Sequence, residues 1–323
     1  MVEPLVDRKE IRLAMLGMVD GNGHPYSWSA MFNGYDPQAM AECPYPVIPE
    51  YLGKEPVGTL EISDAEVTHI WTDDPADARH VARCSCIPHV VDEATDVIGE
   101  VDAVIIATDK GHEHVARCEP FVEAGLPIFV DKPLVDNAED LAVFNRWVED
   151  GSPIMSSSCM RYCKEYMPYR MSTNNLGKVR YATITTPKTW ERYGIHALEG
   201  VYPILGPGFE TARNTGTRER NVVHFTHRCG ADVVVVASKD MTGAFGVLSL
   251  CGTADSAQVR MKDTFYAFKT QLEAFVEYLR TGERPFPYEE TDELMRMVIA
   301  GIHSREHGGR KVPLDMVTVE GLA

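Results

Sequence analysis

Residues Val101–Thr108 have the sequence VDAVIIAT, and this stretch decides the fold. Its side chains are almost all apolar with no polar alternation, which is typical of a parallel strand buried on both faces. A segment with helical spacing follows at His114–Ala124 and ends at Gly125, and a second apolar run, PIFVDKPL, follows at Pro127–Leu134. Two strands joined by a helix predict a βαβ unit.

The same alternation continues on both sides of this unit. Further strands are expected at Ile11–Gly17 (IRLAMLG) and Val67–Thr72 (VTHIWT). Helices are expected from Pro25 through Phe32, at Asp77–Ala82 and at Ala138–Glu149. Repeated βαβ units predict a dinucleotide-binding Rossmann domain over residues 1–152.

An insertion interrupts this domain at about residues 34–64. Its first part, Gly34–Gly58, is rich in proline and tyrosine and is too long for a simple connection between a helix and a strand. Two interpretations stay open: a surface loop, or a flap over the site or subunit contact.

Residues 153–323 have a different pattern. Longer strand-like runs, VRYATITT, DVVVVAS and GAFGVLSL, are separated from helical segments around 194–205, 269–280 and 292–304. This pattern predicts an α+β domain built on an open, mainly antiparallel sheet, giving an α/β fold class for the chain. The domain is expected to bind substrate and, through its apolar sheet face, to form a homodimer or homotetramer.

Composition excludes several classes of protein. The 323 residues carry a net charge of −17, which disfavours nucleic acid and anionic membranes, and no apolar run reaches the length of a membrane span. The charged N-terminus has no secretory signal, so a cytoplasmic location is expected. Neither the cysteine spacing nor the pairs His224/His227 and His303/His307 give a convincing ligand set, so no metal is expected.

The turn after the first strand, GMVDGNGHP, contains Gly17, Gly21, Gly23 and His24. Glycines in such a turn let a pyrophosphate approach backbone amides at a helix N-terminus, but the usual G-x-G-x-x-G spacing is lost. A cofactor turn and a plain βα turn both remain possible. Asp20 would disfavour a pyrophosphate unless its carboxylate points away.

Two acids follow the second strand, where a ribose is normally bound. Asp73 or Asp74 could accept hydrogen bonds from the adenosine hydroxyls and would repel a 2′-phosphate, and no arginine stands nearby in the sequence. NAD is therefore expected, and NADP is less favoured. The alternative role of the two acids is to cap the helix that begins near Pro75.

Six segments in the same order resemble the Gfo/Idh/MocA family of oxidoreductases. They are VDAVIIAT, His114, EAGLPIFVDKPL, MRY (Met160–Tyr162), GIHALE (Gly194–Glu199) and HSREHGGRKVPL (His303–Leu314). The resemblance implies that the chain is an NAD(P)-dependent dehydrogenase with cofactor contacts at Thr108, Asp109, Lys110, His114 and Asp131. It also implies a substrate site that includes Arg161, Arg192, Tyr193 and Glu199.

The same resemblance points to Lys132 and His196 as catalytic residues. Lys132 follows a buried strand, where desolvation would lower its pKa and suit it to proton transfer. His196 is expected to be the base for a substrate hydroxyl. Arg192 stands where the family commonly has aspartate. If Arg192 lies beside His196, its positive charge would lower the pKa of His196 and favour an anionic substrate. Glu199 replaces a second family aspartate.

The expected reaction is hydride transfer between a nicotinamide cofactor and a hydroxyl of a sugar, cyclitol or sugar acid. Two alternatives remain. One is a lyase, epimerase or glycoside-cleaving enzyme that retains NAD and oxidises its substrate transiently. The other is a non-catalytic dinucleotide-binding partner subunit, suggested by the altered glycine turn and Arg192.

Overall fold

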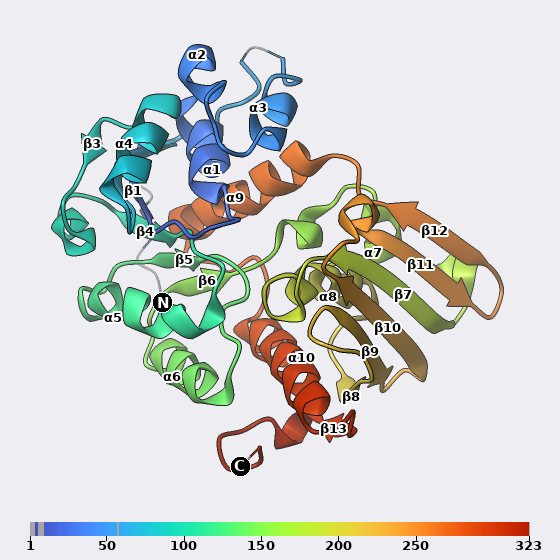
Figure 1. The fold of residues 1–323 in the computed structure, drawn as a ribbon. Helices are drawn as coiled ribbons and strands as arrows, with labels where there is room; N and C mark the ends of the chain where they lie inside the picture. The colour runs from blue at the N-terminus through green and yellow to red at the C-terminus, as the bar shows by residue number, and fades with distance from the viewer. Residues whose placement is uncertain (1–3, 6–9, 57, 323) are drawn as a thin grey trace.

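The computed structural model describes residues 4–5, 10–56 and 58–322, which form two domains, each built on one sheet (Figure 1). Most of the N-terminal segment in which no secretory signal is expected lies outside the described residues. No helix in the described part of the chain is long and apolar enough to cross a membrane.

The first sheet is parallel and has the order β3-β2-β1-β4-β5-β6, the arrangement of a Rossmann domain. Its central strand β4 is wholly buried, as the apolar run VDAVIIAT predicts. The strands are β1 (Ile11–Leu16), β2 (Ala65–Trp71), β3 (His89–Val90), β4 (Ala103–Ile106), β5 (Ile128–Val130) and β6 (Ile154–Ser156).

Four longer helices connect these strands. They are α1 (His24–Asn33), α4 (Pro75–Cys84), α5 (His114–Glu123) and α6 (Ala138–Glu149), joined by the short turns η1 (Ala94–Val97) and η2 (Gly111–Glu113). Each coincides with an expected helix. The sheet continues through β6, past the expected boundary at 152/153, so we propose that the first domain ends after Ser156.

The insertion between α1 and β2 contains two short helices, α2 (Pro37–Met40) and α3 (Val47–Leu52). Ile48 and Leu52 of α3 are buried, and α3 contacts both α1 and the C-terminal helix α9 (Thr264–Thr281). Part of the insertion is therefore packed against both halves of the chain, which distinguishes it from a free surface loop.

The second sheet has the order β12-β11-β7-β10-β9-β8-β13 and is mixed: β7 and β10 pair in parallel and the other pairs are antiparallel. Side chains alternate between a buried and an open face, because successive residues of a strand point to opposite sides. The strands are β7 (Val179–Pro187), β8 (Phe209–Asn214), β9 (Arg220–His227), β10 (Ala231–Ser238), β11 (Val247–Gly252), β12 (Ser256–Arg260) and β13 (Val312–Pro313).

Helices α8 (Trp190–Leu205) and α10 (Tyr288–Glu306) pack on this sheet, whereas α9 crosses back to lie against α1 (Figure 1). The chain thus returns to the first domain after completing most of the second. Short elements complete it: α7 (Met167–Met171), η3 (Cys159–Tyr162), η4 (Asn174–Leu176), η5 (Thr242–Ala244) and η6 (Leu314–Met316).

Candidate active site

The glycine turn, residues 17–23, joins β1 to α1 at the carboxyl edge of the parallel sheet. Gly17 has a φ of 84°, and a Cβ there would lie 2.7 Å from Thr108 Cγ2, so the position favours glycine. Asn22 ties the turn to the sheet, since its Nδ2 donates to the carbonyl of Ala107 at 3.2 Å and to Asp131 Oδ2 at 2.9 Å.

Three amides of this turn are free to bind a ligand. The N–H groups of Val19, Asp20 and Gly23 donate to no group within the described residues, and no side chain caps the start of α1. Free amides ahead of a helix N-terminus attract anions. The sequence alone left open where the Asp20 side chain points. In the structure Asp20 is an exposed residue.

Two cations of the second domain hold the same turn from the other side. Arg192 Nη2 donates to the carbonyl of Asp20 and Lys188 Nζ to that of Gly21, both at 3.1 Å. Lys188 Nζ also donates to the hydroxyl of Tyr193 at 2.7 Å. The glycine turn is therefore part of the contact between the domains.

Lys132 is buried at the end of β5, with 2% of its surface exposed. Its Nζ lies 3.4 Å from Asp109 Oδ2, and the other oxygen of Asp109 accepts from Arg192 Nη2 at 2.5 Å. Burial alone would lower the pKa of Lys132, but Asp131 and Asp109 outweigh it and raise the pKa above its ordinary value. The expected lowering is therefore wrong, because it took no account of the neighbouring Asp131 or of Asp109, which β4 brings to this ammonium.

Arg192 belongs to this ionic cluster and does not act on His196 as expected. Burial raises the pKa of Asp109, but the charges of Lys132 and the hydrogen bond from Arg192 outweigh it and bring the pKa to about 2. The pKa of His196 is lowered by its burial and then by Lys132, His24 and Lys188, with no contribution from Arg192. The guanidinium of Arg192 instead donates hydrogen bonds to Asp109 and to the Asp20 carbonyl of the glycine turn.

His196 lies on α8 and is almost completely buried. Its Nδ1 is 2.6 Å from Ser158 Oγ, which also accepts from the amide of Met160 at 3.0 Å. The Ser158 hydroxyl also contacts the thiol of Cys159, and a hydroxyl can donate to Nδ1 or accept from it. Burial keeps the pKa of His196 well below 6.5, so its ring is neutral at neutral pH.

His24 begins α1 and is held by a buried carboxylate. Its Nδ1 lies 2.6 Å from Asp131 Oδ2, and its ring stacks on Trp28 with 4.3 Å between centroids. Phe268 of α9 packs edge-on at 5.1 Å. The ring is thus fixed on three sides.

Both histidines border one pocket of about 320 Å³ between the domains. Glycine-turn residues, α3 of the insertion, the start of α9 and the second domain form its wall, and none of the lining side chains is a carboxylate. The polar lining residues are Asn22, His24, Ser27, Tyr45, Tyr51, Lys188, Tyr193, His196, Thr242 and Thr264.

A second cavity, of about 260 Å³, lies between β2, η1, β4 and α5, beside Asp73. Asp73 accepts from the amide of Met18 at 3.3 Å and from Arg117 Nη2 at 2.8 Å. Arg117 also pairs with Glu113 at 2.9 Å. The expectation that no arginine stands near this acid is therefore wrong, because α5 brings Arg117 from a distant part of the sequence.

Asp74 has a different role from Asp73. Its side chain accepts from the amide of Ala76 at 2.8 Å and caps α4, which was the alternative interpretation of this acid. Thr108 and His114 are fully buried and hydrogen-bonded to each other, so they support the end of β4 from inside. Lys110 pairs with Glu113 on the surface at 3.2 Å.

Arg161 and Glu199, expected to bind substrate, instead form a buried ion pair and do not border the pocket. Arg161 also pairs with Glu290 at 2.7 Å. The second oxygen of Glu199 accepts from the amide of Ser158 at 2.7 Å, which fixes the serine that contacts His196. The pair therefore supports the site indirectly.

The remaining histidine pairs show no ligand set. His224 bonds to Asp232, while the rings of His303 and His307 stack at 3.9 Å. No group of three or more possible metal ligands occurs among the residues that the structure describes.

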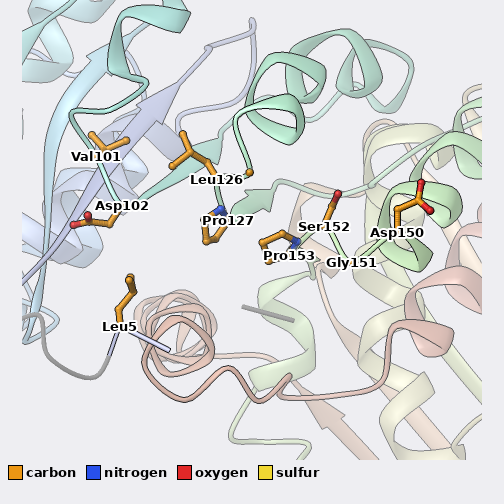
Figure 2. A pocket seen from close by; sticks show the side chains of 10 residues that line it. Leu5, Val101, Asp102, Leu126, Pro127, Asp150, Gly151, Ser152 and Pro153 are labelled. Carbon is orange, nitrogen blue, oxygen red and sulfur yellow. The ribbon is translucent and has the colours of Figure 1, made fainter. Parts of the chain in front are cut away.

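A wider hollow of about 560 Å³ lies at the opposite, amino edge of the parallel sheet, around Asp102, Pro127 and Pro153 (Figure 2). Ligands of open parallel sheets bind at the carboxyl edge, where the glycine turn and both histidines lie. The smaller pocket between the domains is therefore the candidate active site.

Comparisons with known proteins agree with this geometry. Residues 52–150 match the model of the oxidoreductase family with an NAD-binding Rossmann fold, GFO_IDH_MocA. No curated protein matches the sequence. The first domain, at least, carries the fold of a dinucleotide-binding oxidoreductase.

Solved structures extend the likeness of fold to both domains. A putative myo-inositol dehydrogenase from Sinorhizobium meliloti is 17% identical, with a TM-score of 0.72 over 94% of this chain and 100% of that one. Myo-inositol dehydrogenase from Lactobacillus casei, solved with NAD(H) and myo-inositol, is 14% identical, with a TM-score of 0.73 over 94% and 96%. An Agrobacterium radiobacter oxidoreductase, solved with NAD⁺, L-tartaric acid and magnesium, is 14% identical, with a TM-score of 0.73 over 95% and 99%.

The fold and the interdomain site define a two-domain oxidoreductase of the Rossmann class. Residues 52–150 match the Gfo/Idh/MocA model, in agreement with the sequence resemblance. The identities to solved structures are low, so those structures speak for the fold alone.

Sequence reasoning missed three polar residues of the site, Asn22, Ser158 and Arg117, and the pairing of His24 with Asp131. The segment GNGHP contains Asn22 and His24, but Asn beside glycine is common in turns and gave no distinctive signal. Ser158 gave none. Trp190, at the start of α8, is a core residue whose Nε1 donates to the carbonyl of Val298 at 2.9 Å.

Proposed function

We propose that this protein is an NAD(H)-dependent dehydrogenase that transfers hydride to or from a hydroxyl-bearing carbon of a sugar, cyclitol or sugar acid. The observation that carries the proposal is the pocket between the domains, bordered by the glycine turn on one side and by Tyr193 and His196 on the other. Its volume of about 320 Å³ suits a small substrate.

Several features fit a dinucleotide. The free amides of Val19, Asp20 and Gly23 could hold the pyrophosphate, and the cavity beside Asp73 could take the adenosine. Gly17 keeps this path open, because a Cβ there would strike Thr108. When bound, the nicotinamide supplies the hydride acceptor or donor.

NAD is favoured over NADP by the charges around the second cavity. Asp73 could accept from a ribose hydroxyl, and the positive charge of Arg117 is already shared between Asp73 and Glu113. A 2′-phosphate would have to compete with both carboxylates for that arginine.

The chain's own side chains would orient the substrate and exclude water. His196, whose ring is neutral, can hydrogen-bond to a substrate oxygen from the pocket wall. Lys188 and Tyr193 add polar contacts on the same wall. Lys132 keeps a part in this proposal as the buried cation that holds Asp109 and Asp131 beside the pocket.

Assembly and location are also proposals. The open face of the second sheet contains Tyr181 and Val222, both 39% exposed, with Val234 and Val236 half-buried between them. We expect this face to pair in a cytoplasmic homodimer or homotetramer. A monomer by light scattering at micromolar concentration would contradict the expectation.

A substrate screen tests the function. Purified protein with NAD should reduce the cofactor, measured by absorbance, in the presence of at least one member of a panel such as myo-inositol, scyllo-inositol, glucose, gluconate and L-tartrate. Product without NADH release would favour transient oxidation with retained cofactor. No product from any member, together with no binding of NAD or NADH, would favour the partner-subunit alternative.

A further inference from the structure

We propose that His24 is the catalytic residue that exchanges the substrate's hydroxyl proton, and that Asp131 is its positioning residue. The inference rests on the proposed function and deepens it. His24 comes from the glycine turn, which the sequence connected only with cofactor binding.

The first step is the geometry of His24. Its ring borders the pocket, while Trp28 covers one face and Phe268 packs against it edge-on. Its Nδ1 is committed to Asp131, and its Nε2 bonds to no group within the described residues. A histidine held so firmly at one nitrogen presents the other to a ligand.

The second step is the tautomer, which Asp131 determines. The carboxylate is fully buried and takes three contacts: from Asn22 Nδ2 at 2.9 Å, from His24 Nδ1 at 2.6 Å, and from the amide of Lys132 at 2.7 Å. Burial raises its pKa, but His24 and Lys132 outweigh the burial and hold the pKa below its ordinary value. An ionised carboxylate only accepts hydrogen bonds, so Nδ1 of His24 bears the proton and Nε2 has the lone pair.

The third step is the contrast with His196. There Nδ1 meets the hydroxyl of Ser158, which can donate or accept, whereas Nδ1 of His24 meets a carboxylate that only accepts. Of the two imidazoles on the pocket wall, His24 is thus the one whose partner leaves a lone pair on Nε2 to accept a proton, and His196 is placed to hydrogen-bond to a substrate oxygen. An alcohol undergoing oxidation needs a proton acceptor and is oriented by a donor to its oxygen.

The proton and electron balance is as follows. The C–H bond breaks and its electron pair leaves with the hydride for the nicotinamide dinucleotide. The O–H bond breaks, its proton goes to the lone pair on Nε2 of His24, and its electron pair becomes the second bond of the carbonyl. The reverse direction returns the proton from Nε2 to the oxygen.

Charged groups face His24 from three elements. Asp131 and Lys132 follow β5, Asp109 follows β4, and His196 comes from α8. Arg192 of α8 pairs with Asp109, so Lys132 and Arg192 balance the two carboxylates, and Asp131, in direct contact with the ring, is the group that stabilises a positive charge formed on His24 during the reaction.

The first test needs no substrate. Long-range ¹H–¹⁵N correlation spectra of the full-length protein, with and without NADH, assign the protonated nitrogen of each histidine. We expect the Nδ1-protonated form for His24 and loss of this preference in Asp131→Asn. A neutral His24 protonated on Nε2 would overturn the proposal even if NADH binds.

The second test is kinetic, on the panel member that the wild type converts best. His24→Gln should lower kcat about 100-fold or more, the effect of a lost acid–base group, with the Kd for NADH changed less than threefold. His112→Gln is the matched control, because His112 also pairs with an acid, Asp136, but its side chain is 60% exposed and outside the pocket.

The outcomes separate the two proposals. Wild type that neither binds NADH nor converts a panel member contradicts the proposed function. Active wild type with His24→Gln within threefold of it contradicts the role of His24. If His24→Gln is poorly folded by circular dichroism, His24→Asn and the tautomer spectra of the wild type decide.

Discussion

Lys132 and His24 share one carboxylate, Asp131, but they meet it in different surroundings. Lys132 is sealed in the interior between Asp131 and Asp109, and its pKa is raised. His24 meets the same carboxylate from the pocket side and keeps one ring nitrogen for a ligand. The comparison teaches that a basic side chain at the end of a parallel strand can stabilise the site or work in it, and that burial separates the two roles.

The largest expected effect on stability comes from Lys132→Met, which removes the shared cation and leaves two buried carboxylates short of a partner. We expect the free energy of unfolding to fall by about 3–5 kcal/mol, the cost of breaking a buried ion pair. Urea denaturation measures it, with Lys54→Met as control, since Lys54 forms an exposed pair with Glu50.

His24→Gln should show the opposite balance, with lost turnover and a much smaller loss of stability. Lys132→Met with unchanged stability but strongly reduced kcat would instead indicate that the ammonium touches the substrate. That result would reverse the comparison.

The sequence was sufficient to predict the parts of the fold that depend on local pattern. The unbroken apolar run VDAVIIAT became the buried strand β4, and helix α6 (Ala138–Glu149) has the predicted bounds. Strand β8 (Phe209–Asn214) was missed because its polar residues, including Arg213 and Asn214, obscure the alternation.

The site was predictable only in part, because its contacts join distant segments. The peptide bond between Lys132 and Pro133 is cis. The ionic cluster joins Asp109 and Lys132 to Arg192, and the tautomer of His196 depends on Ser158, which lies 38 positions away. No spacing rule predicts such pairings; they follow from the way α8 meets the parallel sheet.

A smaller effect is expected from Arg192→Leu, which acts on the Lys132 side of the comparison. Removing its hydrogen bonds to Asp109 and the Asp20 carbonyl should lower the free energy of unfolding by about 1.5–3 kcal/mol, the range for hydrogen bonds to charged groups. The histidine spectra should show His196 in the same tautomer as in the wild type. A changed tautomer or ionisation of His196 would show that Arg192 acts on it after all.

The smallest effect is a dependence of stability on pH. The folded pKa of His196 lies below its unfolded value of 6.5, so below about pH 6.5 the unfolded chain takes up the proton first and stability falls. Asp109, with a folded pKa of about 2 against 3.8, adds a second loss as the pH falls from about 4 to 2.

The melting temperature should therefore decrease as the pH is lowered from 7.5 to 5. For one such histidine, the free energy of unfolding should fall by up to about 1.4 kcal/mol per pH unit. His196→Gln should flatten this part of the curve, and His112→Gln should not. A melting temperature that rises on acidification would show that His196 is protonated in the folded protein.

Binding of the dinucleotide is the most direct test of the account. Calorimetric titration of the full-length protein with NADH should show one site per chain, with weaker binding of NADPH because Asp73 and Glu113 already occupy Arg117. Absence of any heat of binding at millimolar NADH, from protein shown to be folded, would contradict the claim that the glycine turn and the interdomain pocket form a dehydrogenase site.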